Sequence, residues 1–423
     1  MAGAHTKVLE VRFHDGRLVG RLVHCGPVYF AYDAGWLATG HNLSPLSLPF
    51  TETPFNCKAE GCEGLPGVIA DSLPDAWGMK VAQAVFARAD WGRPTPVKLL
   101  AWIGRGGVGA LSFHPPTEPR NEYSGRISAA SLAREAKAVM RGDPKAVIST
   151  LESAGLAGGA QPKALVMEHA DGSLSLAKTP AARGDTPSLL KLSVPGQPAN
   201  GDAATEHAFG RMTAAAGIRT ASSKLIEDEH GTRHLLVKRF DFDARGGRKH
   251  MHSLSALLHR PKHGLDYADL FQAIAALPSP DCVAEAARRM VFNLYAGNDD
   301  DHGRNHAFLY DEPSHTWQLS PAYDVTFSPA TLSRGMTIMG EMRPSWKRLA
   351  EWLETTGLSP STIKNIRDDV LKAISRWKHF ADQSGVPQER IKAISNELDA
   401  IAEAINSDAH GVVGNAGLPY SFL

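Results

Sequence analysis

Hydrophobic and polar residues alternate in the first part of the chain, the pattern of strands that bury one face. Residues 7–13 and 19–23 alternate in this way, and between them His14-Asp15-Gly16 contains the Asp-Gly pair that favours a tight hairpin turn. Two further short strands are expected at 30–32 and 45–49. Together these segments predict a small β-rich unit at the start of the chain.

Helical spacing, with apolar residues recurring every three to four positions, dominates other parts of the chain. Segments with helical character are 71–104, 269–277, 283–295, 361–377 and 388–405. A stretch rich in Pro, Asn and Ser at 114–126 is typical of a linker. The pattern therefore predicts an α+β protein with a β-rich beginning and a mostly helical end.

The composition and charge of the chain argue against several classes of protein. The 423 residues include 45 Lys and Arg and 45 Asp and Glu, so the formal net charge is zero. This balance argues against a surface that grips nucleic acid or an anionic membrane as a whole. We expect a cytoplasmic protein without a membrane partner, because the sequence has neither a long apolar run nor the apolar core of a secretory signal. The four cysteines are expected to be free thiols.

Two glycine-rich segments have different sequence settings. Residues 104–109 fit G-x-G-x-x-G, but they follow a helical pattern and precede a strand, so we expect a structural turn. Residues 155–163 lead into a strand pattern at 164–167 and an Asp-Gly turn at 171–172. A glycine turn among strands is the setting of a phosphate-covering loop in kinases.

The densest polar cluster lies at 297–305, directly after an apolar helical pattern. It reads Gly-Asn-Asp-Asp-Asp-His-Gly-Arg-Asn, and adjacent carboxylates repel one another unless a cation is near. An acidic turn exposed to solvent is the plain alternative. However, Asp300 and Asn305 have the D-x-x-x-x-N spacing of kinase catalytic loops, in which Asp accepts a hydroxyl proton and Asn holds Mg²⁺. Asp324, in a strand-like setting at 317–324, is expected to return to the same cleft as a second metal ligand.

Residues that a kinase small lobe requires precede this cluster. Lys191 lies inside an apolar strand pattern, where a lysine needs an anion, and Glu206 follows on a helical stretch. A strand at 234–241 would bracket an adenine with its backbone, and Asp241 would reach a ribose hydroxyl. Each residue also has a plain alternative: Lys191 as a snorkelling lysine, Glu206 as a solvated helix residue, and Asp241 as the ion-pair partner of Arg239.

Because these features occur in order along one chain, we expect a two-lobed protein-kinase-like fold. A β-rich N-terminal cap would occupy residues 1–115, and a small lobe with the glycine-rich loop would occupy 125–264. A mostly helical catalytic lobe would follow at 265–423. The catalytic cleft would lie between the lobes.

With these residues in view, the chain resembles the HipA family of serine/threonine-protein kinase toxins. The motifs that match are DSLPDAWG at 71–78, GGAQPK at 158–163, RFD at 239–241, DDHGRN at 300–305 and PAYD at 321–324. The resemblance covers nearly the whole chain. It implies ATP- and Mg²⁺-dependent phosphorylation of a serine or threonine in a cellular protein.

The resemblance also implies roles for single residues. Asp300 would be the catalytic base, and Asn305 and Asp324 would hold Mg²⁺. Lys238 and Phe240 would offer backbone groups to the adenine. The residues expected to bind ATP are Gly158, Gly159, Ala160, Gln161, Lys163, Lys191, Lys238, Phe240, Asp241 and His302. His302 has an alternative role as a hydrogen-bond donor within its own loop.

Partners follow from the same resemblance. A small helix-turn-helix antitoxin would neutralise the kinase, and the pair would bind operator DNA mainly through the antitoxin. The protein substrate is open; an aminoacyl-tRNA synthetase is one candidate from the family. Many members carry an autophosphorylated serine where this chain has Leu156, so self-inactivation by that route lacks its usual residue here.

Three alternatives stay open at the level of sequence. The same fold could phosphorylate a small-molecule hydroxyl, or it could be an inactive kinase-like scaffold that acts as a co-repressor with the antitoxin. A metal hydrolase built on the carboxylates at 299–301 and on His302 is a weaker alternative, because it leaves the glycine-rich loop and Lys191 without a role.

Overall fold

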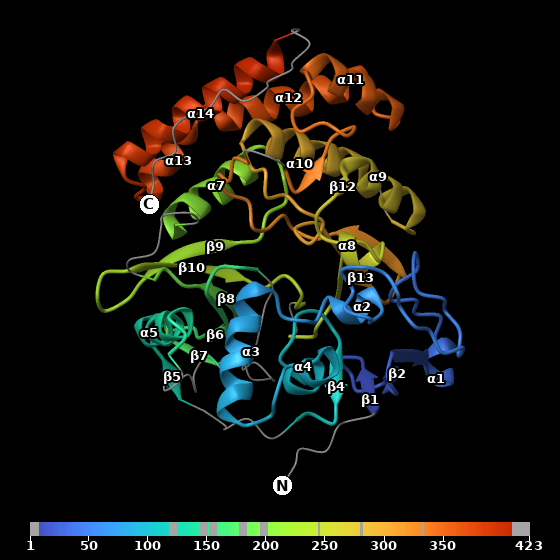
Figure 1. Ribbon diagram of the computed structural model, residues 1–423. Helices are drawn as coiled ribbons and strands as arrows, with labels where there is room; N and C mark the ends of the chain where they lie inside the picture. Colours follow the sequence, from blue (N-terminus) through green and yellow to red (C-terminus); the bar gives the residue numbers. More distant parts are fainter. Residues whose placement is uncertain are drawn as a thin grey trace.

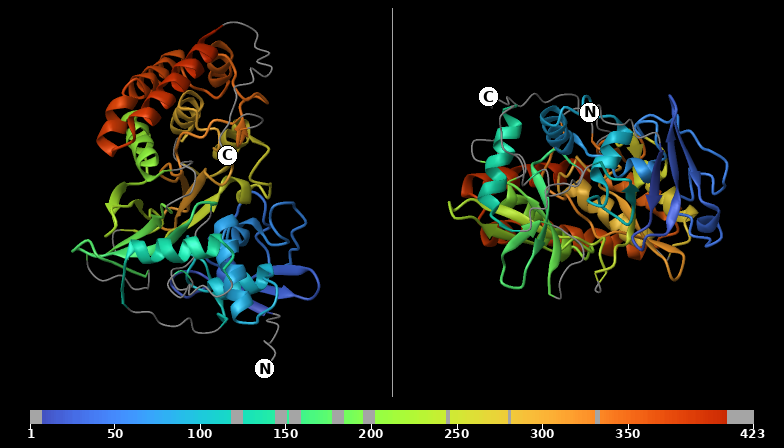
Figure 2. Two further views of the ribbon diagram at one scale, coloured as in Figure 1. Left: turned by 60° about the vertical axis from the view of Figure 1, so that its left-hand side comes forward. Right: turned by 90° about the horizontal axis from the view of Figure 1, so that it is seen from below.

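The fold is that of a computed structural model, which describes residues 8–117, 125–143, 151, 159–176, 184–194, 202–243, 246–279, 282–330 and 334–407. The C-terminal helices gather at one end of the molecule and the larger sheets lie toward the other (Figure 1). The same separation is visible after rotation, in the left view of Figure 2. The predicted α+β fold with two lobes is therefore confirmed.

The N-terminal unit is built on a four-stranded antiparallel sheet with the order β3-β2-β1-β4. Its elements are β1 (Val8–Arg12), β2 (Leu18–His24), β3 (Val28–Tyr32), α1 (Ala34–Leu37), α2 (Gly67–Ala70), α3 (Ala76–Arg88), α4 (Pro96–Ile103) and β4 (Ser112–His114). The predicted hairpin at the Asp-Gly pair is confirmed, with Gly16 at φ 91°. The strand predicted at 45–49 is wrong: this proline-flanked segment forms turns, because proline has no N–H to donate to a sheet.

The second unit is a six-stranded antiparallel sheet with the order β5-β7-β6-β8-β10-β9. Its elements are β5 (Arg126–Ile127), α5 (Ala129–Met140), β6 (Lys163–Glu168), β7 (Leu174–Leu176), β8 (Thr186–Lys191), α7 (Ala203–Ala215), β9 (Ser223–Glu227) and β10 (Arg233–Lys238). Helix α7 lies between this sheet and the C-terminal helices (Figure 1). Its Phe209 ring packs against the ring of Trp377 with centroids 5.0 Å apart, so α7 connects this sheet to the C-terminal helices.

The third unit combines helices with two small sheets. Its elements are β11 (His250–Ser253), α8 (Leu254–Leu257), β12 (Leu265–Asp266), α9 (Tyr267–Ala276), α10 (Val283–Tyr295), β13 (Ala307–Asp311), β14 (Thr316–Leu319), β15 (Met336–Thr337), α11 (Trp346–Thr355), α12 (Pro360–Ile374), α13 (Trp377–Ser384) and α14 (Gln388–Asn406). Strand β11 pairs with β13, so it shares a sheet with the third unit. The chain therefore enters a sheet of the third unit at His250, before the domain boundary expected after residue 264.

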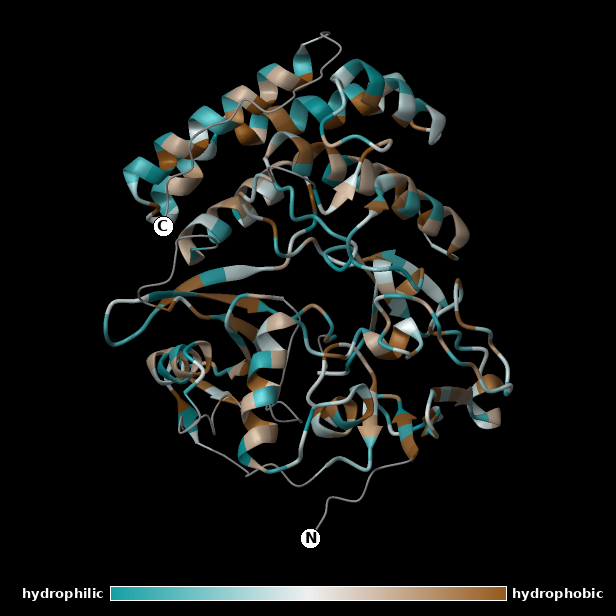
Figure 3. Ribbon diagram, in the orientation of Figure 1, coloured by the Kyte–Doolittle hydropathy of each residue, from teal (hydrophilic) through white to brown (hydrophobic). Residues whose placement is uncertain are grey.

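The C-terminal helices are amphipathic, as their spacing predicts. Hydrophilic and hydrophobic segments alternate along them in Figure 3. In α14 the buried residues, all at most 4% exposed, are Ile391, Ile394, Leu398, Ile401 and Ile405. Each such side chain contributes roughly 1.5–3 kcal/mol on burial, so packing rather than helix propensity holds this end together. Among the residues that the structure describes, no helix has the length and apolar character of a membrane span.

Candidate active site

A buried lysine connects the second unit of the fold to the third through an ion pair. Lys191, at the end of β8, forms ion pairs with Glu206 on α7 and with Asp324 in the loop after β14. The Lys191 and Glu206 side chains are 6% and 9% exposed, whereas that of Asp324 is 30% exposed. The predicted grouping of Lys191, Glu206 and Asp324 is therefore present, and the snorkelling and solvated alternatives are excluded for Lys191 and Glu206.

Electrostatics favour the charged forms of Lys191 and Asp324, whereas burial raises the pKa of the Glu206 carboxyl despite the opposing pull of Lys191. Burial opposes the ammonium form of Lys191, but the Asp324 and Glu206 carboxylates outweigh it and raise the pKa of Lys191. Burial likewise opposes the ionised form of Asp324, but Lys191 and Lys163 outweigh it and hold the Asp324 pKa below its usual range. Asp324 is thus an anion at neutral pH. It also has a φ of 56°, a backbone conformation that is uncommon outside glycine and that often occurs at functional sites.

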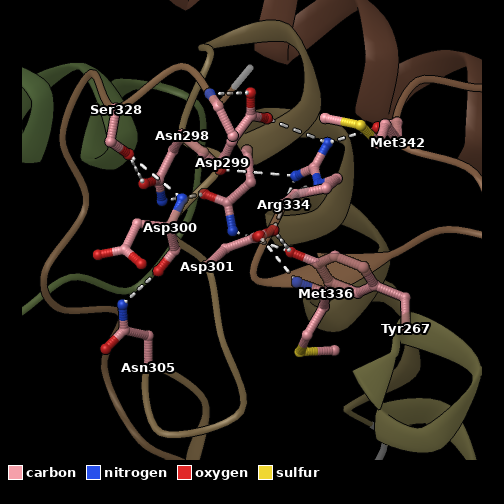
Figure 4. Close-up of polar contacts among 12 residues, drawn as sticks. Tyr267, Asn298, Asp299, Asp300, Asp301, Asn305, Ser328, Arg334, Met336 and Met342 are labelled. Carbon is pink, nitrogen blue, oxygen red and sulfur yellow. Dashed lines mark hydrogen bonds and ion pairs between the residues drawn. The ribbon is translucent and has the colours of Figure 1, made fainter. Parts of the chain in front are cut away.

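The three adjacent carboxylates after α10 have different surroundings (Figure 4). Asp299 pairs with Arg343 at 2.6 Å, and Asp301 pairs with Arg334 at 2.8 Å and accepts a hydrogen bond from Tyr267 at 2.6 Å. Asp299 and Asp301 are both buried and neutralised. Arginines therefore neutralise two of the three adjacent carboxylates, Asp299 and Asp301.

Asp300 is the exception within this cluster. Its side chain is exposed and points away from Arg334 (Figure 4). Within the described residues its carboxylate has no hydrogen-bond or ion-pair partner; only its backbone is held, by Ser328 Oγ and by the Asn305 amide at 2.8 Å. A free carboxylate on a fixed backbone can accept a proton from a ligand, as predicted for Asp300.

The metal-hydrolase alternative finds no support here. Its carboxylates Asp299 and Asp301 are bound to arginines, and the described part of the chain holds no cluster of three His, Cys, Asp or Glu side chains that suits a metal ion. His302 is half-buried against the ring of His263, at 5.3 Å between centroids. Burial lowers the pKa of His302, Asp300 opposes this effect, and Lys262 and His263 add to it.

The described part of the glycine-rich loop ends at Lys163, which lies within electrostatic reach of Asp324 and Lys191. Gly159 adopts φ 109°, and a side chain there would collide with the ammonium of Lys163, so glycine is required. Lys163 is buried, which lowers its pKa, while Asp324 partly restores it. Ala160 is exposed and Gln161 half-buried. Gly158 and Leu156 lie outside the described residues.

A clamp from the N-terminal unit holds the glycine turn. Asp75 Oδ2 accepts a hydrogen bond from Gly159 N at 2.8 Å, and its other oxygen pairs with Arg304 of the loop at 300–305. Trp77 N donates to Gly159 O at 3.1 Å, and Trp77 Nε1 donates to Lys163 O at 3.0 Å. Asp75 stands at the N-cap position of α3, yet its side chain makes no capping hydrogen bond. The only signal was the DSLPDAWG motif that contains it.

Asp75 is therefore a positioning residue, and its loss should loosen the glycine turn. If the site binds ATP as the sequence predicts, we expect Asp75→Ala to raise the KM for ATP and to lower kcat/KM by about 10- to 100-fold, because small misplacements of reacting groups are costly. Steady-state phosphorylation assays would measure both constants. Lys80→Ala, on the exposed side of the same helix, is the matched control and should leave both unchanged. Equal kinetics for Asp75→Ala and the control would contradict this role.

Strand β10 is the strand that was expected to contact adenine. Just after its end, Asp241 does not have the surroundings that were predicted for it. Lys238 N donates to Ser222 O at 2.8 Å, so its carbonyl is the backbone group left for a ligand. The half-buried ring of Phe240 lies 5.4 Å from that of Tyr323. Asp241 is 1% exposed; it accepts two hydrogen bonds from Arg239 and one from Gly109 N.

Asp241 is thus a structural residue, and the ribose role expected for it is corrected. Both of its oxygens are occupied by Arg239, so the ion-pair alternative holds. The same contacts explain the segment 104–109: it follows α4, precedes β4, and packs on Arg239 through Gly107 O. Its predicted role as a structural turn is confirmed.

His306, which directly follows the loop at 300–305, allows a test by pH. It is buried against Tyr267, and neither ring nitrogen has a partner among the described residues. Burial lowers the pKa of His306 to about 4. The unfolded chain protonates near the ordinary value of about 6.5, so stability falls as pH drops from there to 4, by roughly 3 kcal/mol. Urea unfolding at several pH values would measure the free energy of unfolding, which should fall less steeply with decreasing pH for His306→Phe than for the native protein. The same dependence on pH in both proteins would contradict this role of His306.

Two sequence models of known families match the chain. The HipA N-terminal domain matches residues 9–114, and the HipA-like C-terminal domain matches residues 155–405. The second match alone covers more than half of the chain. The first spans nearly the same residues as the β-rich unit expected at 1–115.

Single relatives agree with these matches. A protein of Sinorhizobium fredii named "Putative kinase Y4mE" is 26% identical over 431 residues, which cover 94% of this chain and 91% of that protein. A Haemophilus influenzae protein of similar name is 25% identical, covering 45% of this chain and 67% of its own length. HipA of Shewanella oneidensis, solved with HipB and operator DNA, superposes with a TM-score of 0.68 at 17% identity, over 94% of this chain and 97% of that one. That likeness shows a shared fold.

Proposed function

The chain belongs to the HipA family, and on this premise we propose that it is an ATP- and Mg²⁺-dependent serine/threonine-protein kinase, the toxin of a toxin–antitoxin pair. The observation that carries the proposal is the arrangement of Lys191 between Glu206 and Asp324, near a loop whose Asp300 is free. An inactive scaffold would not need a buried lysine that is held between two carboxyl groups.

Asp300 would act on the acceptor hydroxyl. The hydroxyl oxygen of the substrate forms a bond to the γ-phosphorus, the bond from phosphorus to the β-phosphate oxygen breaks, and ADP leaves. The Asp300 carboxylate orients the hydroxyl and accepts its proton. The protein forms no covalent bond to the substrate in this step, so catalysis depends on how the reacting groups and charges are positioned.

Lys191 would bind phosphate oxygens, and Glu206 would hold its ammonium in place. Lys163 and the turn at 159–161 would cover the phosphates from the other side. The carbonyl of Lys238 and the backbone of Phe240 would contact the adenine. The clamp by Asp75 favours this placement, because it fixes the turn against the catalytic loop.

The residues present suit Mg²⁺. The Asn305 amide nitrogen is engaged by the Asp300 carbonyl, which leaves its oxygen for a cation, and Asp324 has one oxygen outside its pair with Lys191. Mg²⁺ needs only one or two protein oxygens when phosphates supply others. Asn305 and Asp324 would hold the ion, which would neutralise charge on the phosphates.

We extend the proposal to partners. The Shewanella oneidensis neighbour was solved with HipB and operator DNA, which supports an antitoxin partner for this chain as well. Because the net charge is zero, DNA contact would come mainly from a helix-turn-helix antitoxin.

Incubation of the full-length protein with radiolabelled ATP, Mg²⁺ and cell lysate tests the proposal. We expect label on serine or threonine of a protein band, and loss of that label when EDTA removes the metal. Label in a small soluble product would favour a small-molecule kinase instead. An absence of ATP turnover would favour the inactive scaffold and contradict the proposal.

A further inference from the structure

A concave site lies beside the catalytic loop at 300–305. It is a cavity of about 240 Å³ between the N-terminal unit and residues 255–263. Its charged lining consists of Asp75, Arg260, Lys262, His263 and Arg304. We call these residues and the space they enclose the basic pocket. None of the nucleotide contacts proposed above lies in its lining.

The basic pocket is joined to the catalytic loop by backbone hydrogen bonds. Gly303 N donates to Lys262 O at 2.9 Å, and Ser255 N donates to Gly303 O at 3.1 Å. On the opposite wall Gly61 lies so close to Pro261 that a side chain there would approach within 2.8 Å of its Cα. The pocket therefore keeps its position relative to Asp300, and the N-terminal unit forms part of it.

The charges of the basic pocket are unbalanced. Arg304 is matched by Asp75, and Arg260 pairs at 2.7 Å with Asp269, which does not line the pocket. Lys262 is exposed and, among the described residues, has no acidic partner. A concave surface with surplus positive charge attracts anions, since its walls focus the field.

The basic pocket is also close to the proposed catalytic group. The ring of His263 lies against that of His302, two positions after Asp300. His302 is within electrostatic reach both of Asp300 and of Lys262 and His263. A peptide that presents a hydroxyl to Asp300 would therefore pass the pocket with its neighbouring residues.

We propose that the basic pocket binds an anionic residue of the protein substrate, a carboxylate or a phosphate next to the acceptor serine or threonine. This inference rests on the proposed kinase function and adds a substrate class to it. Lys262 would supply the unpaired cation, with Arg260 beside it. The clamp residue Asp75 would keep Arg304 neutralised, so the pocket would take one anion rather than a highly charged polymer.

Charge reversal at Lys262 tests the proposal. Cell lysate would be incubated with ATP, Mg²⁺ and one of three full-length proteins: the native protein, Lys262→Glu or Lys262→Arg. Mass spectrometry would identify the phosphorylated sites, and sites that also appear with Asp300→Asn would be subtracted. We expect sites flanked by Asp, Glu or a phosphorylated residue, and about tenfold lower labelling of them by Lys262→Glu, because like charges now meet. Lys262→Arg should retain them, and Lys378→Glu, an exposed lysine on α13, is the matched control.

Each outcome is decisive. Labelling that depends on Asp300 but has no anionic flanks, or that Lys262→Glu leaves unchanged, would overturn the basic pocket and leave the kinase proposal standing. Absence of any site that depends on Asp300 would instead overturn the kinase function itself. Lysate treated first with phosphatase separates the two anions: retained labelling identifies a carboxylate, and lost labelling identifies a phosphate.

Discussion

Replacement of Asp300 by asparagine is expected to lower kcat for phosphoryl transfer by about 10³-fold, because general-base catalysis contributes on the order of 10²–10⁴. The affinity for ATP should stay within about twofold of the native value, since the Asp300 carboxylate has no partner in the described structure whose loss would disturb the nucleotide cleft. Single-turnover transfer from labelled ATP would measure the rate, and titration calorimetry would measure nucleotide binding.

The neighbouring carboxylate Asp301 provides the matched comparison. Asp301→Asn should cost several kcal/mol of stability, of the order of 3–5, because it leaves the buried Arg334 guanidinium without its closest counter-charge. Asp300→Asn should leave the free energy of unfolding nearly unchanged. If Asp300→Asn destabilised the protein as much as Asp301→Asn did, its loss of activity would reflect misfolding and not catalysis.

Lys191→Met is expected to have the second large effect, on both stability and activity. Glu206 would stay buried without its cation, and removing one partner of a buried ion pair costs about 3–5 kcal/mol. Activity should fall by about 10²-fold or more, because the phosphates lose a charged donor that acts in a cleft of low dielectric constant. Urea unfolding and transfer assays on the same preparations would measure both effects.

A double variant separates these effects. Lys191→Met combined with Glu206→Leu should regain most of the lost stability, since buried ion pairs can be replaced by apolar groups at little cost. It should regain none of the activity. Activity restored by the double variant would mean that Lys191 serves the fold alone, contrary to the proposed role in phosphate binding.

Local patterns were enough to predict much of the site. Lys191 stood inside an apolar strand pattern, Glu206 on a helix, and Asp300 and Asn305 at a fixed spacing within one loop. Each of these signals lies within a short stretch, and pairing of consecutive strands then gathers them. Antiparallel pairing of β13 with β14 brings Asp324 back toward the same loop, as expected.

Other features depended on residues far apart in the chain. The bond from Gly159 N to Asp75 spans 84 positions, and Asp299 is neutralised by Arg343, 44 positions away. For Asp241, the surrounding sequence was compatible both with a ribose contact and with an ion pair to Arg239. Only the proximity of Gly109 N, 132 positions earlier, shows that its carboxylate faces the N-terminal unit.

A crystal structure of the protein with a non-hydrolysable ATP analogue and Mg²⁺ would show whether these side chains share one nucleotide. We expect phosphate density between the glycine turn at 159–161 and Lys191, a metal ion against Asn305 and Asp324, and the terminal phosphate facing Asp300. A nucleotide bound elsewhere, or those side chains left without contact to it, would contradict the proposed kinase site.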